Sequence, residues 1–447
     1  MLYRLFKFLL LLTTKAYFRS IYIQNKELVP KKGPVLFVAN HTSAFMDPIL
    51  LAIHIKRPLY FLARGDVFKN NFVSALFNKL HMIPIYKADV SPNEMHKNKK
   101  VFEKCYSHLE NGKTVMIFPE GVSKTERRLR KFKTGVSRIA FGAEEKNNYE
   151  LGLTIVPIGI NYSNPHHFKS DVFVKFGAPI PVSKFKENYQ NNPKEAVVSF
   201  TERIKNRLEK LVVVIENERF EKIIKQIEIL YRSKLRENNS QQEKAPLDFY
   251  LSKDIVKAIA YFAKKSPEKL NQFEKNITQY LNNLKRLKIR DTQVRNSKNS
   301  KDLTLIILHF IAGFPLFIYG YFFNFIPFKI AEFLTKKIQV RKDFIGSMKL
   351  GIGMLIFLIT YIVQASLLAL YLNWIWAFIC LLSFYPTGLF TANYIKKYFQ
   401  VRGILRYLYL STKKSEMINQ IKATRLELVT ELEENKTAYL HQLKKEN

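Results

Sequence analysis

The sequence predicts an α/β fold, in which a mixed sheet is covered by helices, joined to charged helices and to C-terminal helices embedded in a membrane. Short apolar runs alternate with amphipathic stretches between residues 19 and 185, as strands and helices do in an α/β sheet. Long apolar segments lie between 303 and 395, and strongly charged sequence precedes and follows them. We therefore expect five parts: an interfacial or membrane-associated helix at 1–18, the α/β domain at 19–215, a charged helical region at 216–302, a membrane-embedded region at 303–395, and a charged helical tail at 396–447.

Five apolar runs are the candidate strands of the α/β domain. They lie at 35–39, 59–63, 83–86, 114–118 and 154–160. The first run follows Gly33-Pro34 and contains only apolar residues, which predicts a strand buried on both faces. Amphipathic stretches at 95–109 and 134–145 separate the later runs and predict helices that cover the sheet.

The chain is strongly basic, with 72 Lys and Arg against 37 Asp and Glu and a net charge of +35. Such a charge fits either nucleic acid or an anionic membrane surface with acidic substrates. The sequence has no zinc-finger spacing, no aromatic RNA-binding motif and no basic zipper, so we expect no nucleic-acid partner. Each Lys or Arg near an anionic leaflet contributes roughly 1 kcal/mol of attraction, and we expect membrane lipids as partners.

The two cysteines give no sign of a disulfide framework or of a metal site. Cys380 lies inside an apolar run, and Cys105 lies in an amphipathic stretch of the α/β domain. A cysteine metal site needs closely spaced ligands, which this pair does not supply. We expect no metal ion in this protein.

The first 18 residues have an apolar centre at 8–12, flanked by Arg4, Lys7 and Lys15. They lack an A-x-A cleavage site, so a cleaved signal peptide is not expected. The apolar stretch is also short for a membrane span, which favours a helix lying in the membrane interface. A helix buried in the α/β domain is the alternative.

Three apolar segments, at 303–323, 347–372 and 374–395, approach the roughly 20 residues that span a bilayer. Positive clusters flank them: Arg295, Lys298 and Lys301; then Lys336, Lys337, Arg341 and Lys342; then Lys396, Lys397 and Arg402. Positive charge favours the cytoplasmic side of a membrane. All three clusters can lie on that side only if the first apolar segment enters the bilayer and returns to the same side. We expect a re-entrant hairpin at 303–328, broken at Gly313-Phe314-Pro315, and a two-helix hairpin turning at 372–374. Three full crossings are the alternative.

The first candidate catalytic motif is Asn40-His41-Thr42-Ser43-Ala44-Phe45-Met46-Asp47-Pro48, directly after the first strand. Ligands of open α/β sheets bind at the carboxyl ends of strands. His41 is suited to accept a proton near neutral pH, and a carboxylate such as Asp47 would fix its tautomer. No serine or cysteine stands in a nucleophile-elbow motif, so the pattern predicts a base that activates a substrate hydroxyl. A helix cap at Thr42 or Ser43 with a surface aspartate is the structural alternative.

Three further motifs follow strands or open a helix. In Phe118-Pro119-Glu120-Gly121, Glu120 is suited to accept a hydrogen bond from a polyol hydroxyl, and Gly121 lets backbone amides approach a ligand. Arg64 follows the second strand and matches a phosphate bidentately, with Lys69 adding a second charge. A basic loop at 127–135, which contains Lys133, is suited to an acidic head group or carrier; a solvated charge run is its alternative.

Taken together, these motifs resemble the acyltransferase domain of the phospholipid/glycerol acyltransferase family over residues 30–182. That family has a His–Asp block, a block with a phosphate-binding Arg, a Phe-Pro-Glu-Gly block and an apolar block with Pro, in this order. Here the last block is Val156-Pro157-Ile158-Gly159-Ile160. The family's usual spacing has four residues between His and Asp, whereas five lie here, 42–46. This spacing is similar to a subgroup that acylates glycerol-3-phosphate or dihydroxyacetone phosphate.

The resemblance implies the glycerolipid acyltransferase fold and a direct acyl transfer. It implies that His41 removes the proton of the acceptor hydroxyl, Asp47 orients His41, Arg64 holds the acceptor phosphate, and Glu120 and Gly121 position the glycerol. It implies no cofactor beyond an acyl thioester co-substrate, carried by coenzyme A or acyl carrier protein. The expected acceptor is glycerol-3-phosphate or 1-acylglycerol-3-phosphate, at the cytoplasmic side of a bacterial inner membrane.

Two alternatives to this function remain open from the sequence. One is remodelling of another lysolipid or an aminolipid by the same chemistry. The other is a catalytically inactive membrane scaffold that binds lipid. The presence of His41, Asp47, Arg64 and Glu120 speaks against the scaffold, because an inactive relative is expected to have lost at least one of them.

Overall fold

The computed structural model describes residues 2–68, 70–87, 90, 92–238, 244–295 and 301–446. The chain forms two compact units. Unit 1 contains Met1–Val214 and Leu334–Met354, and unit 2 contains Ile215–Phe333 and Leu355–Asn447. This division differs from the five expected parts, because a piece of the expected membrane-embedded region packs with the α/β domain.

Unit 1 is built on one mixed sheet, which agrees with the fold class expected from the sequence. Its strands are β1 (Ser20–Gln24), β2 (Val35–Ala39), β3 (Leu59–Arg64), β4 (Met82–Ile85), β5 (Thr114–Ile117), β6 (Thr154–Tyr162), β7 (Asp171–Phe176) and β8 (Ile180–Pro181). Their order is β1-β7-β6-β2-β5-β3-β4, with β8 beside β6. Strand β2 pairs in parallel with β5 and β6, and β3 pairs in parallel with β4 and β5. Strand β6 pairs antiparallel with β7 and β8.

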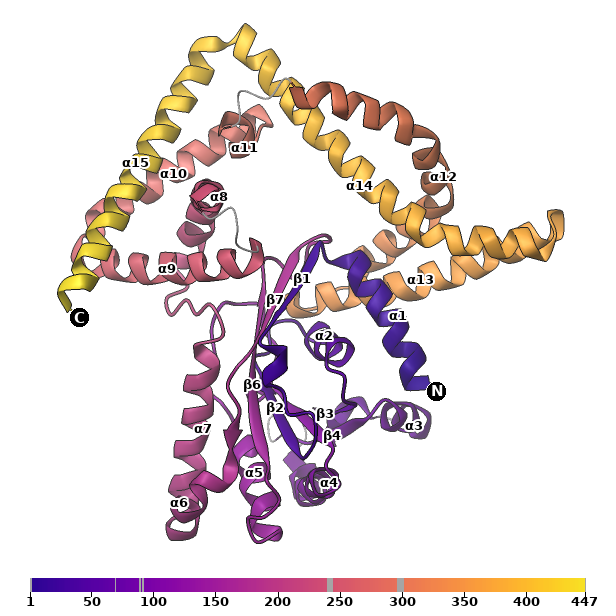
Figure 1. Cartoon of the computed structure of the whole chain (residues 1–447), viewed down its shortest axis with the longest axis vertical. Coiled ribbons are helices and arrows are strands. Elements are labelled where there is room, and N and C mark those ends of the chain that lie inside the picture. The colour runs from indigo at the N-terminus through magenta and orange to yellow at the C-terminus, as the bar shows by residue number, and fades with distance from the viewer. Residues whose placement is uncertain are drawn as a thin grey trace. The chain divides into compact units, whose positions relative to one another are not determined.

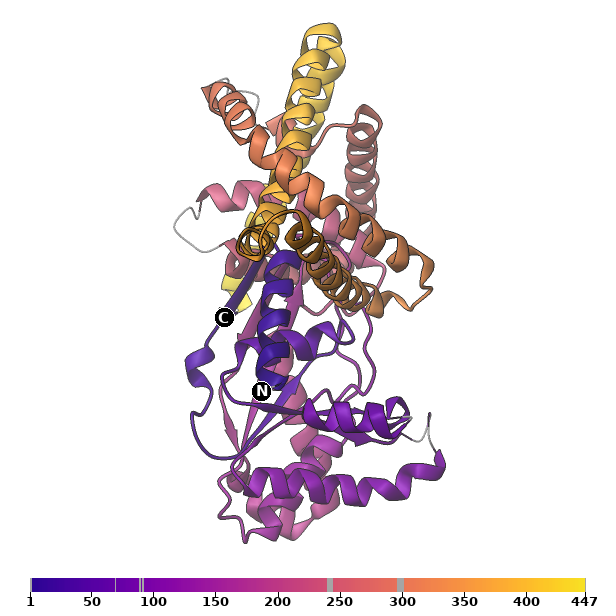
Figure 2. The same cartoon turned by 90° about the vertical axis from the view of Figure 1, so that its right-hand side faces the viewer.

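Helices cover both faces of this sheet because its central strands are apolar throughout. The helices are α1 (Leu2–Tyr17), α2 (Met46–His54), α3 (Asn71–Lys79), α4 (Asn98–Glu110), α5 (Gly135–Lys146), α6 (Lys186–Asn191) and α7 (Pro193–Glu209). Leu36 and Val38 of β2 pack in one core with α4, α5 and α7. Val35 and Phe37 pack in the other core with α1 and α2. Figures 1 and 2 show α1 and α2 on one side of the sheet, and Figure 1 shows α5 and α7 on the other.

The five strands expected from apolar runs are confirmed as β2 to β6, and their ends differ by no more than two residues. The sequence analysis missed β1, β7 and β8. In β7, the apolar run Val172-Phe173-Val174 is only three residues long and lies between Asp171 and Lys175, so it is too short to mark a strand. Strand β1 is the edge strand beside β7, and its residues are only partly buried.

Helix α1 agrees in part with the alternative of a helix buried in the α/β domain, and its interfacial position stays a prediction. Its last turn is buried at Thr14 and Tyr17. Leu10 and Leu11 pack against the core that α2 forms with the sheet. Earlier in the helix, Phe8 remains 56% exposed. One end of α1 is therefore part of the α/β domain, while the other presents apolar side chains outward.

Unit 2 is helical in its described residues. It contains α8 (Phe220–Asn238), α9 (Lys244–Lys265), α10 (Pro267–Leu287), α11 (Asp291–Arg295), most of α12 (Lys301–Lys337), the second part of α13 (Lys342–Tyr371), α14 (Trp374–Lys413) and α15 (Ser415–Glu446). Its core joins α8 and α10 to α14 and α15. Within it, Arg425 Nε and the Tyr280 hydroxyl donate to the buried Asp291 carboxylate at 2.8 and 2.7 Å. A buried charge needs such partners, so this contact fixes α10, α11 and α15 together.

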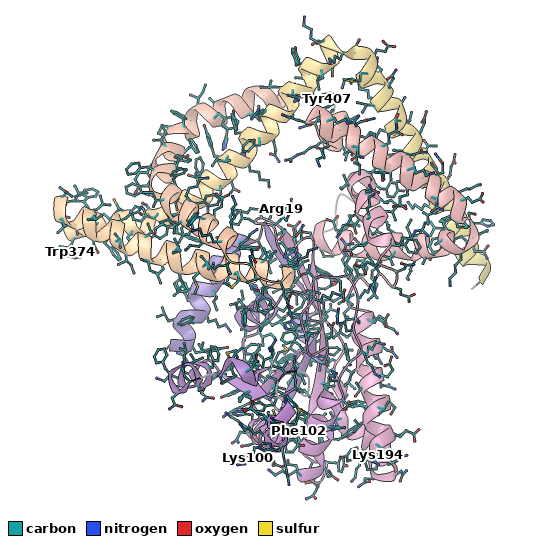
Figure 3. The ribbon with its side chains drawn as sticks, turned by 180° about the vertical axis from the view of Figure 1, so that it is seen from behind. Arg19, Lys100, Phe102, Lys194, Trp374 and Tyr407 are labelled. Atoms are coloured by element: carbon teal, nitrogen blue, oxygen red, sulfur yellow. The ribbon has the colours of Figure 1, made fainter. Side chains whose placement is uncertain are left out.

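Three helices, α12, α13 and α14, are long and apolar enough to cross a membrane. The hairpin turn expected at 372–374 is confirmed, because α13 ends at Tyr371 and Asn373 caps α14 through the Trp376 amide. Figure 3 labels Trp374 at the tip of this hairpin and Tyr407 farther along α14. The expected break at Gly313-Phe314-Pro315 is wrong, because α12 is a continuous helix that curves in Figure 1.

Packing against α14 explains why α12 continues through its prolines. Phe317 of α12 stacks on Tyr394 of α14 with the ring centroids 4.5 Å apart. A side chain at Gly320 would overlap Thr387 and Thr391, so the two helices lie in close contact there. A proline removes one hydrogen bond and bends a helix, and neighbouring helices stabilise such bends in membranes.

Candidate active site

The candidate site lies where four adjacent parallel strands end. Strands β6, β2, β5 and β3 are neighbours in that order and run in the same direction. Their carboxyl ends therefore meet at one edge of the sheet. Tyr162 ends β6, His41 follows β2, Glu120 follows β5, and Arg64 ends β3. The sheet order alone brings all four of these side chains to the same edge.

The imidazole of His41 is hydrogen-bonded to the carboxylate of Asp47. His41 Nδ1 lies 2.8 Å from Asp47 Oδ2, the Asp47 side chain is fully buried, and that of His41 is 18% exposed. An ionised carboxylate only accepts hydrogen bonds, so Nδ1 carries the proton and Nε2 keeps its lone pair. The ring is thus held in the tautomer that a general base requires.

Two further donors hold the Asp47 carboxylate in place. The Ser43 amide donates to Oδ2 at 2.8 Å, and the Tyr162 hydroxyl donates to Oδ1 at 2.7 Å. Burial and the neighbouring Asp47 raise the pKa of Tyr162, so the phenol stays protonated and remains a donor. A buried carboxylate is stable only when it is paired in this way.

The five residues between His41 and Asp47 form a tight turn into α2. The Asp47 amide donates to the Ser43 carbonyl at 3.1 Å, and α2 begins at Met46. Asp47 therefore lies in the first turn of a helix, where the helix dipole favours a negative charge. The longer spacing still brings the carboxylate back to the ring, as the expected His–Asp pairing requires.

Glu120 connects the His41 loop to the loop after β5. Its side chain is 6% exposed, and its two oxygens accept hydrogen bonds from the His41 and Arg130 amides at 2.8 and 3.3 Å. Burial raises the pKa of Glu120 to about 7, although these backbone hydrogen bonds oppose the rise. In the structure, both Glu120 oxygens are bonded to backbone amides. The expected contact of Glu120 with a glycerol hydroxyl stays a prediction.

More contacts join the same two loops around the ring of His41. Phe118 stacks on the imidazole with the centroids 4.2 Å apart and the planes 21° from parallel. The Lys124 amide donates to the His41 carbonyl, and the Thr125 hydroxyl donates to the Thr42 carbonyl. These contacts restrict the ring plane as well as its tautomer.

The cationic residues of the motifs are spread around this edge. Arg64 forms a two-pronged ion pair with Asp66, with Nε–Oδ1 and Nη2–Oδ2 distances of 2.9 and 2.6 Å. That pairing lowers the pKa of Asp66. Lys69 lies outside the described residues.

Gly121 adopts a φ of +74°, which favours glycine. A Cβ atom built there would lie 3.8 Å from both Lys133 Cγ and Lys87 Nζ. The structure thus places Lys133, and also Lys87, beside the Phe-Pro-Glu-Gly loop. The rest of the basic loop is partly paired: Arg130 forms an ion pair with Glu126 at 2.9 Å.

Sequence reasoning missed Tyr162 and Lys87. Tyr162 ends the strand that contains the apolar block Val156-Pro157-Ile158-Gly159-Ile160, and its place at the end of that strand was the available signal. Among the described residues, no group of three or more His, Cys, Asp or Glu side chains is arranged to hold a metal ion.

The geometry is one that can support base catalysis on a hydroxyl. Comparison with known proteins shows what this chain is similar to. Residues 20–161 match the family model described as Acyltransferase. The match covers the part of the chain that contains the candidate site. The resemblance drawn from the four motifs is thereby confirmed. The matched residues include His41, Asp47, Arg64, Glu120, Gly121 and Lys133.

Several curated proteins are similar to parts of this chain. Glycerol-3-phosphate O-acyltransferase 1 of Saccharomyces cerevisiae is 27% identical over 293 residues, which are 61% of this chain and 38% of the yeast protein. A 1-acyl-sn-glycerol-3-phosphate acyltransferase of Chlamydomonas reinhardtii is 26% identical over 147 residues, which are 33% of this chain and 40% of that protein. The chain thus spans less than half the length of either relative.

Among solved structures, the chain is similar to the 1-acyl-sn-glycerophosphate (LPA) acyltransferase PlsC from Thermotoga maritima. The identity is 20% and the TM-score is 0.32, over 44% of this chain and 75% of that one.

The raised pKa of Glu120 predicts a pH-dependent stability. The unfolded carboxyl ionises near 4.5, whereas the folded one holds its proton until about 7. Stability from this group is therefore complete below the unfolded pKa and is lost as the pH rises through the folded pKa, by up to about 3 kcal/mol. The free energy of unfolding, measured by chemical denaturation in detergent between these two pH values, should decline as the pH rises in wild type. The decline should be much smaller in Glu120→Gln.

The test compares how steeply the free energy of unfolding changes with pH. Its absolute value also differs between the two proteins, because a glutamine at position 120 cannot accept from both the His41 and the Arg130 amides. Glu187→Gln, which changes an exposed carboxyl of the same unit, is the matched control and should keep the wild-type slope. An unchanged slope in Glu120→Gln would contradict the assignment.

Proposed function

We propose that this protein transfers a fatty acyl group from an acyl thioester to a hydroxyl of glycerol-3-phosphate or 1-acylglycerol-3-phosphate, as a step of phospholipid biosynthesis. The observation that carries the proposal is the hydrogen bond between His41 Nδ1 and the buried Asp47 carboxylate. It leaves Nε2 as a base at the carboxyl edge of the sheet, within a domain of the acyltransferase family.

In the proposed reaction, His41 Nε2 removes the proton of the acceptor hydroxyl while the oxygen attacks the thioester carbonyl. The tetrahedral intermediate then collapses, the ester forms, and the carbon–sulfur bond breaks. The departing thiolate takes the proton from the imidazolium, which Asp47 stabilises meanwhile. A thioester is already activated, so positioning and one base supply much of the acceleration. The proposed co-substrate is a thioester of coenzyme A or of acyl carrier protein, with no metal or prosthetic group.

We propose that the cations around the site bind the acceptor phosphate. Arg64 offers a planar fork that matches phosphate oxygens, and Lys69 and Lys133 add positive charge. The ion pair with Asp66 holds the Arg64 guanidinium at the end of β3, and we propose that a bound phosphate takes the place of the Asp66 carboxylate on the Nε–Nη2 edge. Glu120 and Gly121 are proposed to shape the glycerol subsite.

The names of the relatives support the choice of acceptor. They act on glycerol-3-phosphate or on 1-acyl-sn-glycerol-3-phosphate, and both acceptors carry a phosphate and a free hydroxyl. The alternative of an inactive scaffold is disfavoured, because the His41–Asp47 pair is intact and oriented.

Three long apolar helices indicate membrane association. We further propose that the active site faces the cytoplasm at a bacterial inner membrane. Lys336, Lys337, Arg341 and Lys342 belong to unit 1, the unit that contains the site, and positive clusters beside membrane spans favour the cytoplasmic side. Thioesters of coenzyme A and of acyl carrier protein would meet the site there.

Replacement of the base tests the proposal. Wild type and His41→Ala, purified in detergent, are offered glycerol-3-phosphate, dihydroxyacetone phosphate and lysophosphatidate side by side with an acyl thioester. Wild type should acylate at least one acceptor, and His41→Ala should lose about 10²- to 10⁴-fold in kcat. His167→Ala, which removes an exposed imidazole from the same unit, should behave as wild type. Activity retained in His41→Ala would remove the proposed base.

Replacement of Arg64 tests the phosphate site separately. Arg64→Ala should raise the KM for the phosphorylated acceptor by about 10- to 100-fold, because a hydrogen bond to a charged group contributes about 1.5–3 kcal/mol. The KM for the thioester should stay near the wild-type value, and Arg64→Lys should recover only part of the loss. Arg207→Ala, at an exposed position of α7, is the control. An unchanged acceptor KM in Arg64→Ala would place the phosphate elsewhere.

A further inference from the structure

The first turns of α13 contact both loops that form the site. This segment, 341–350, lies about 180 residues beyond the end of the family match yet belongs to the same compact unit as the site. It touches the His41–Asp47 loop at Met46 and the loop after β5 at Ser123. A helix that would otherwise be regarded only as a membrane span therefore supplies part of the site's frame.

The contact with the first loop satisfies a buried amide next to Asp47. Ser347 Oγ accepts a hydrogen bond from the Met46 amide at 2.9 Å, and both residues are buried. Met46 is the first residue of α2, where amides have no partner within the helix. The Ser347 hydroxyl thus supplies the acceptor that the start of α2 lacks, one residue before the carboxylate that orients His41.

The contact with the second loop is an ion-pair network. Ser123 Oγ donates to the buried Asp343 carboxylate, and Arg341 Nη2 donates to the same carboxylate at 2.8 Å. Arg341 Nη2 also lies 3.4 Å from the Ser123 carbonyl. Ser123 lies three residues after Glu120, and the next residue, Lys124, donates its amide to the His41 carbonyl. Through Ser123, Asp343 therefore holds the loop after β5, whose Lys124 amide is hydrogen-bonded to the His41 carbonyl.

Packing keeps the segment in this position. The ring of Phe344 meets that of Phe45 edge to face, with the centroids 5.6 Å apart. Gly346 lies against the Pro165 carbonyl so closely that a Cβ would overlap it. Leu350 is buried in the same core as Met46. The hydroxyl of Ser347 and the carboxylate of Asp343 are therefore fixed relative to both loops.

We propose that Ser347 and Asp343 are positioning residues of the acyl-transfer site, which rests on the proposed function. Ser347 holds the start of α2, so the Asp47 carboxylate stays within reach of His41. Asp343 holds the 120–125 loop against the His41 carbonyl. Neither side chain touches the reacting atoms; each acts through the residues that carry or support the base. The catalytic frame thus includes the beginning of a membrane helix as well as the residues of the family match.

A positioning role and a purely structural role predict different measurements. A positioning residue lowers kcat per folded molecule, since a misplaced base fails in the transition state, and it leaves the KM of the acceptor near the wild-type value. A structural residue lowers the folded amount or the melting temperature without a change in kcat per folded molecule. Amide exchange at 43–50 reports whether the start of α2 has loosened.

The experiment uses the full chain in detergent, with Ser347→Ala, Ser347→Thr and the control Ser366→Ala. Ser366 is an exposed serine farther along α13. Ser347→Ala should lower kcat about tenfold, which corresponds to about 1.4 kcal/mol, and should speed exchange at 43–50 more than in the rest of the sheet. Ser347→Thr keeps the hydroxyl and should recover most of the activity. Ser366→Ala should match wild type in both measurements.

Asp343→Asn tests the second contact, with the exposed neighbour Lys342→Gln as control. It should lower kcat about three- to tenfold and speed exchange at 120–125, because the charge that Ser123 and Arg341 share is removed. If Ser347→Ala and Asp343→Asn keep wild-type kcat and exchange, or lose only melting temperature, the inference is overturned while the proposed function stands. If wild type transfers no acyl group, the proposed function fails, and the exchange measurement still decides whether α13 holds these loops.

Discussion

The arrangement of the site depends on one buried carboxylate, that of Asp47. It accepts from the His41 ring, the Ser43 amide and the Tyr162 hydroxyl, so its position is fixed from three directions. Because an unpaired buried charge is strongly destabilising, these donors and the carboxylate must fold together. The turn at 42–46, the start of α2 and the end of β6 meet for this reason. The orientation of the imidazole follows, and the proposed chemistry depends on that orientation.

Much of the fold and the central pair could be predicted from the sequence, because the signals were local. Continuous apolar runs marked β2 to β6, and His41 followed by Asp47 after such a run marked the site. The edge strand β1 and strand β7 were missed, since each has a continuous apolar run of only three residues. The helix through Pro315 was mispredicted because packing against α14, which residue preferences do not encode, decides whether a proline ends a helix or bends it.

The supporting residues could not be predicted because their partners lie far away in the sequence. Tyr162 meets Asp47 across 115 positions, and Ser347 meets Met46 across 301. Only the order of strands in the sheet and the return of the chain into unit 1 bring them together. Glu120 shows a related limit: the sequence indicated an acceptor for a ligand, whereas the structure shows its oxygens bonded to the amides of His41 and Arg130. A motif identifies which residues matter more readily than it identifies what each one contacts.

A double-mutant cycle on His41 and Asp47 tests the central claim most directly. The kcat/KM of acyl transfer is measured for wild type, His41→Ala, Asp47→Asn and the double variant, each normalised to folded protein. If Asp47 acts by orienting the imidazole, its replacement should reduce activity in wild type and have almost no further effect once His41 is absent. Equal losses from Asp47→Asn in both backgrounds would show that the two residues act independently, which would contradict the account.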